Sequence, residues 1–145
     1  CFHLLSAAMW VGGMATLHFA VRPAAASTLP PAQRLPFMAA ALDRFFSWVV
    51  TAIAVLLATG FGMVGQAGGF AEVHWSVHAM LAIGLVMMAL FGHIRLAAHP
   101  RLRRHVDAGN WPAAAAQLDS IRKLVAVNLG LGVLVFVVAV VGRAF

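Results

Sequence analysis

The chain of 145 residues is 63% hydrophobic and only 10% charged, with a mean hydropathy of +0.93. A soluble domain of this length cannot hide so much apolar surface, which excludes that class. The formal net charge of +6 comes from basic residues that lie between apolar stretches. This placement predicts a role in membrane topology and argues against nucleic acid as a partner.

Four apolar stretches each have about the 20 residues that an α-helix needs to cross a bilayer. They are Phe2–Val21, Phe45–Gly65, Trp75–Ala97 and Leu124–Val141. Because backbone groups in lipid must be hydrogen-bonded within the chain, the stretches are predicted to be helices. We therefore expect an all-α, integral membrane four-helix bundle with up-down-up-down topology, forming one domain over residues 1–145. The chain opens at Cys1 without an initiator methionine, so we expect the natural protein to extend before this residue.

Proline and glycine predict where the first three spans end. Pro23 follows the first span, a glycine cluster from Gly60 to Gly69 closes the second, and Pro100 follows the third. The third connection is the longest. Within it, Trp111–Lys123 begins with a proline in a helix-start position and predicts a short amphipathic helix at the membrane surface.

The basic residues predict the orientation of the bundle. The second connection holds only Glu72, and the C-terminal end holds only Arg143. The other Lys and Arg residues all flank the first or third connection: Arg22, Arg34, Arg44, Arg95, Arg101, Arg103, Arg104, Arg122 and Lys123. The positive-inside rule then puts the first and third connections in the cytoplasm and both termini in the periplasm, in a bacterial inner membrane.

Histidines occur at the same 15-residue interval in the first and third spans: His3 and His18, then His78 and His93. Fifteen residues separate two helix positions by about 22 Å and about 60°, so each pair lies on one broad face. Since these spans are predicted to run parallel, His3 is expected level with His78, and His18 level with His93. Two bis-histidine haem b groups, or one, fit this arrangement, because haem iron accepts two axial imidazoles.

Other side chains allow more than one interpretation. Arg22, Arg44 and Arg95 are placed to pair with haem propionates, although a role in topology alone would explain them. Seven methionines offer copper as an alternative, because thioethers suit Cu(I), but flexible filling of helix interfaces explains them too. His99 and His105 lie among arginines and are expected to be solvated or near lipid headgroups.

Three segments resemble the copper-resistance protein D (CopD) family of bacterial membrane proteins. They are FHLLSAAMWVGGM at 2–14, DRFFSWVVTAIAVLLATGFGM at 43–63 and the stretch from GHIRLAAHP to LVFVVAVVG at 92–142. This resemblance implies a four-helix unit for copper uptake or resistance. The chain is also distantly similar to HemJ-type protoporphyrinogen oxidases through His3 and Trp10, which implies haem b binding. The lysine that HemJ proteins carry near the start of the third span is absent here.

The leading hypothesis is a membrane b-type cytochrome that carries electrons across the bilayer. His3 with His78 and His18 with His93 would be the iron ligands, and the partners would be a quinol pool and a periplasmic carrier or larger respiratory complex. Three alternatives stay open: copper transport or delivery, haem-dependent porphyrinogen oxidation, and a non-catalytic anchoring subunit. Glycine- and alanine-rich helix faces are also compatible with a homodimer.

Overall fold

The computed structural model describes residues 1–144, and Phe145 lies outside the described residues. Every regular element in this range is a helix. The elements are α1 (Phe2–Thr16), η1 (Leu17–Val21), α2 (Arg22–Thr28), α3 (Pro31–Gln66), α4 (Trp75–His93), η2 (Ile94–Ala98), α5 (His99–Asp107) and α6 (Trp111–Ala144). The two η elements are π-helical turns that join their neighbours into continuous rods. Four rods are long and apolar enough to cross a membrane, which confirms the predicted all-α membrane bundle.

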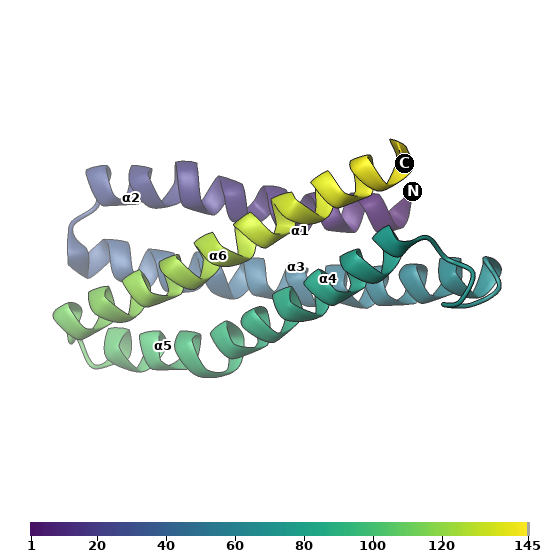
Figure 1. Ribbon diagram of the computed structural model, residues 1–145. Helices are drawn as coiled ribbons and strands as arrows, with labels where there is room; N and C mark the ends of the chain where they lie inside the picture. The colour runs from purple at the N-terminus through teal and green to yellow at the C-terminus, as the bar shows by residue number, and fades with distance from the viewer. Residues whose placement is uncertain (145) are drawn as a thin grey trace.

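The rods alternate in direction along the chain, as predicted (Figure 1). Both termini lie at the same end as the α3–α4 connection, and the α2–α3 and α5–α6 connections lie at the opposite end. We call the first the termini end and the second the basic end, since most Lys and Arg residues gather there. α1 packs on α3, α4 packs on α6, and α6 also contacts α1.

The first and third rods are longer than predicted because their prolines do not end them. Pro23 and Pro100 each lie at the start of a helix, α2 and α5, that continues the rod. Proline has no N–H to donate, and its ring clashes with the carbonyl four residues back. A π turn precedes each proline, with backbone bonds from Arg22 to Leu17 and from His99 to Ile94. This wider turn makes room for the ring, so the rods reach Thr28 and Asp107.

The predicted surface helix at Trp111–Lys123 is not a separate element, and that detail is wrong. The segment forms the first turns of α6. One of its faces is buried at helical spacing, through Ala114, Leu118, Ile121 and Val125. That face continues along the rod, so the helix has no reason to break at the membrane boundary. The short amphipathic helix before the fourth rod is instead α5, the last part of the third rod, which buries Leu102 and exposes its arginines.

Aromatic rings and close helix contacts form the core. Phe91 of α4 packs edge-on against Trp10 of α1 at 6.1 Å and against Phe46 of α3 at 5.5 Å between ring centroids. On α6, a Cβ atom at Gly132 would lie only 2.6 Å from Val11 Cγ2 and 3.3 Å from Met87 Cε. Glycine at this position therefore lets α6 approach α1 and α4 closely, as small residues do between membrane helices.

Candidate functional site

The outer predicted histidine pair, His3 and His78, lies near the termini end, but the two rings have different neighbours. His3 is half-buried, and its Nδ1 lies 2.9 Å from Thr59 Oγ1 on α3. Its ring also rests against Gly60, where a Cβ would be 3.3 Å from His3 Cε1. His78 is exposed, and its ring lies 6.0 Å from that of Phe70 in the α3–α4 connection. His3 therefore interacts with α3 and His78 with the connection.

The inner predicted pair, His18 and His93, differs in the same way. His18 is half-buried within η1, its ring meets Phe19 edge-on at 4.9 Å, and it lines a groove between α1 and α6. His93 is exposed at the end of α4. In the described part of the chain, no group of three or more His, Cys, Asp or Glu residues is arranged to hold a metal ion.

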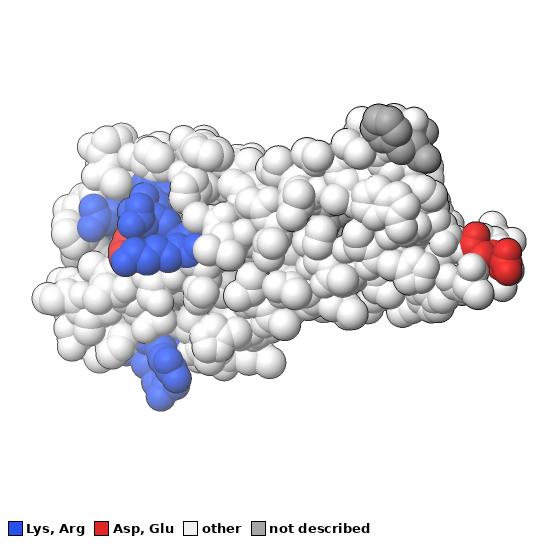
Figure 2. All heavy atoms as spheres, in the orientation of Figure 1, with Lys and Arg blue, Asp and Glu red and all other residues white. Residues whose placement is uncertain are grey.

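The three predicted anion-binding arginines all lie toward the basic end of the molecule. Figure 2 shows Lys and Arg gathered there with some acidic surface beside them, and a patch of acidic residues at the opposite extremity. Arg22 is half-buried and lines a small cavity, Arg44 is exposed on α3, and Arg95 is half-buried in η2. This gathering of Lys and Arg at one end agrees with the pattern that the sequence predicted.

His99 is buried, contrary to the expectation that it would be solvated. Only 5% of its surface is exposed, Nε2 lies 3.0 Å from the carbonyl oxygen of Ala39, and the ring packs edge-on against Phe46 at 5.4 Å. The extra residue in η2 rotates the following helix relative to a regular α-helix. The arginines around His99 in the sequence do not indicate this rotation, so the burial of His99 could not be predicted from the sequence.

Asn128 is a polar side chain deep in the last rod, with 2% of its surface exposed. Its Nδ2 donates to the carbonyl oxygen of Met87 at 3.3 Å, while its Oδ1 is buried without a hydrogen-bond partner. The sequence showed a polar residue inside an apolar span, but the partner on α4 became visible only in the fold.

Three methionines from three different rods lie in the core. Met14 on α1, Met38 on α3 and Met87 on α4 are 2%, 3% and 4% exposed, and they belong to one cluster of buried side chains. Met9 and Met63 are exposed on α1 and α3. The core therefore holds three neutral sulfur groups.

These features define the class of the molecule as an all-α membrane protein with four long apolar helices and thioether groups in its core. The family model described as Copper resistance protein D matches residues 39–142, well over half of the chain. The chain belongs to this family, which confirms the predicted resemblance. No curated protein matches the sequence, and no solved structure matches it.

The leading prediction of a b-type cytochrome is wrong. The family is one of copper resistance, and residues 1–144 contain no cluster of three His, Cys, Asp or Glu side chains suited to a metal. The geometry gives a physical reason, because His78 and His93 are exposed while His3 points to Thr59. That His3, His18, His78 and His93 bind a metal or cofactor stays a prediction. The same holds for a cofactor-binding role of Arg22, Arg44 and Arg95.

Proposed function

We propose that this protein binds copper(I) within its helix bundle and moves it across a bacterial membrane. The observation that carries the proposal is the family match over residues 39–142, which spans most of α3 and all of α4 and α5. Four helices long and apolar enough to cross a bilayer are consistent with movement of an ion through the membrane.

The chemistry of the core supports copper(I) as the transported ion. Cu(I) is a soft ion that prefers thioether and thiolate sulfur, whereas Mg²⁺ and Ca²⁺ require several oxygen ligands. Met14, Met38 and Met87 are buried on three rods, whereas no carboxylate of the described residues is buried. When no ion is bound, a neutral thioether is stable in an apolar core, whereas a buried carboxylate would have a large desolvation penalty.

At the termini end, Cys1 and His3 offer further ligands for an entering ion. Cys1 is exposed, and His3, two residues further along the chain, is half-buried. A thiolate and an imidazole both bind copper. In this proposal, Cys1 and His3 bind the entering copper ion, and the three core methionines bind it as it crosses the bundle. The ion is then released to soluble acceptors at the basic end.

Copper binding by the purified protein tests the proposal. In detergent and under reducing conditions, the protein is expected to retain Cu(I) against a weak competing chelator and to retain no Zn(II). Because Zn(II) lies between hard and soft ions and favours closed sets of His, Cys and carboxylate ligands, it is the matched control. A protein that loses all Cu(I) to the weak chelator, or that binds both ions equally, contradicts copper as its substrate.

We further propose that the protein lies in a bacterial inner membrane with both termini in the periplasm. The support is the charge asymmetry: Lys and Arg gather at the basic end, while Glu72 belongs to the α3–α4 connection at the termini end (Figures 1 and 2). Short loops rich in Lys and Arg stay on the cytoplasmic side.

Labelling of cysteine tests this orientation, because Cys1 is the only cysteine and is exposed. A membrane-impermeant maleimide is expected to label Cys1 in intact spheroplasts. The matched control combines Cys1→Ser with Ser27→Cys, which moves the thiol to an exposed position of α2 at the basic end. This variant should be labelled only after the membrane is permeabilised, and the reverse pattern would refute the orientation.

A further inference from the structure

Two arginines from different rods meet at a small cavity near the basic end. Arg22 at the start of α2 and Arg122 on α6 line a cavity of about 30 Å³ together with His18. The remaining lining is apolar: Leu17, Met38, Leu42, Leu118, Ile121 and Val125. Cations on an apolar wall lose part of their hydration, so the cavity favours a ligand that brings negative charge.

The nearby carboxylate does not balance these cations. Asp119 pairs with Arg122 at 2.6 Å and also with Lys123 at 3.1 Å, so one negative charge serves two positive ones. Among residues 1–144, no carboxylate lies within ion-pair distance of Arg22. The Nε atom of Arg122 is moreover buried and has no hydrogen-bond partner in the protein. The arginines at the cavity therefore have an excess of positive charge and one hydrogen-bond donor, Arg122 Nε, without an acceptor in the protein.

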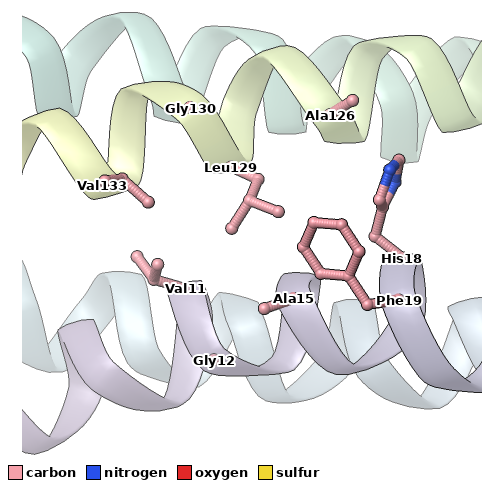
Figure 3. Close-up of a pocket in the computed structure, with 9 residues that line it drawn as sticks. All are labelled: Val11, Gly12, Ala15, His18, Phe19, Ala126, Leu129, Gly130 and Val133. Atoms are coloured by element: carbon pink, nitrogen blue, oxygen red, sulfur yellow. The ribbon is translucent and has the colours of Figure 1, made fainter.

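A long apolar groove leads away from this cavity toward the middle of the bundle. It has a volume of about 470 Å³ and runs between α1 and α6, from Val11 and Val133 to His18 and Phe19 (Figure 3). His18 lines both the groove and the cavity, so the two are neighbours. Gly12 and Gly130 line the groove, and a Cβ atom at either position would meet no atom within 4 Å.

We propose that the cavity and the groove together bind one anionic phospholipid. Its phosphate lies against Arg22 and Arg122, and one acyl chain lies in the groove beside His18. Guanidinium groups bind phosphate through paired hydrogen bonds, and basic pockets between membrane helices attract anionic headgroups. An uncharged amphiphile would fill the groove but leave Arg22 without an anionic partner, and a soluble anion would leave the groove unfilled. The inference does not depend on copper transport.

Lipid binding to the full chain, measured by native mass spectrometry from detergent, tests this site. The probes are phosphatidylglycerol, phosphatidylcholine with the same acyl chains, and soluble glycerol 3-phosphate. We expect phosphatidylglycerol to bind at least about tenfold more tightly than phosphatidylcholine. Both lipids carry a phosphate, but the choline cation of phosphatidylcholine is repelled by the two guanidinium groups and cancels the net negative charge. Glycerol 3-phosphate should bind more weakly still, because it has no chain for the groove.

Variants separate the headgroup from the acyl chain. Arg22→Gln and Arg122→Gln should each reduce binding of phosphatidylglycerol about tenfold and remove the preference over phosphatidylcholine. Gly130→Leu should weaken both lipids by filling the groove. The matched controls are Arg101→Gln, an exposed arginine of α5, and Gly62→Leu, an exposed glycine of α3 with free space at Cβ. Neither control should change binding.

Three results would overturn the proposal. The first is equal binding of the two phospholipids, and the second is a preference for phosphatidylglycerol that survives both arginine substitutions. The third is a dimer that withstands lipid addition and is disrupted by Gly130→Leu, since a second copy of the chain would then occupy the groove.

Discussion

Replacement of Met14, Met38 and Met87 together by leucine is expected to abolish copper(I) transport into vesicles while the bundle stays folded. Leucine has nearly the volume of methionine and such swaps cost less than about 1.5 kcal/mol each, so the core keeps its packing. It has no sulfur, so each substitution removes a soft ligand and nothing else. Each single variant should slow uptake by about tenfold, the effect of losing roughly 1.4 kcal/mol of ligand binding.

The exposed methionines provide the matched control for this experiment. Met9 and Met63 are 39% and 51% exposed, on the same two rods as Met14 and Met38. The double variant Met9→Leu/Met63→Leu should transport copper at the normal rate. If the core variants transport normally, or if the exposed pair has the larger effect, the core methionines are packing residues and the proposed path is wrong.

Gly132→Leu is expected to destabilise the protein by about 3 kcal/mol or to prevent it from folding. A Cβ at this position would lie 2.6 Å from Val11 Cγ2, and valine cannot easily turn aside because its branched side chain has one favoured rotamer in a helix. α6 would have to move away from both α1 and α4. This movement would remove the close helix contacts that hold membrane helices together. Thermal unfolding in detergent measures the loss.

Gly130→Leu is the control for this prediction, because it lies on the same helix two residues away. Its Cβ would meet no atom within 4 Å. We expect the thermal midpoint of Gly130→Leu to match that of the unaltered protein, although its lipid groove is filled. Equal destabilisation by the two substitutions would mean that helix composition, and not the close approach at Gly132, determines stability.

The sequence was sufficient to predict the four spans and their alternating direction, because hydropathy and charge follow from composition along the chain. It was not sufficient to predict where the rods end. Pro23 and Pro100 are helix-breaking signals in isolation. In the fold, the wider turns of η1 and η2 accommodate the proline rings, and the helices continue to Thr28 and Asp107. Whether a proline ends a helix or follows a π turn depends on tertiary packing that no local pattern records.

The candidate site was harder to predict than the fold. The 15-residue interval placed His78 and His93 on one broad face of α4 but did not show that this face points outward, where both are exposed. The methionines gave no regular spacing, since Met14, Met38 and Met87 come from three rods and belong to one buried cluster only in the fold. The pairing of Arg22 with Arg122 at one cavity likewise joins residues that are a hundred positions apart in the chain.

Uptake of copper(I) by vesicles that contain the purified, unaltered protein is the most direct test of the central claim. With reductant present and a Cu(I) indicator inside, the account predicts uptake well above that of protein-free vesicles, saturating with external copper and unaffected by excess Zn(II). Uptake no faster than in protein-free vesicles, by a protein that is folded and correctly inserted, would contradict the account.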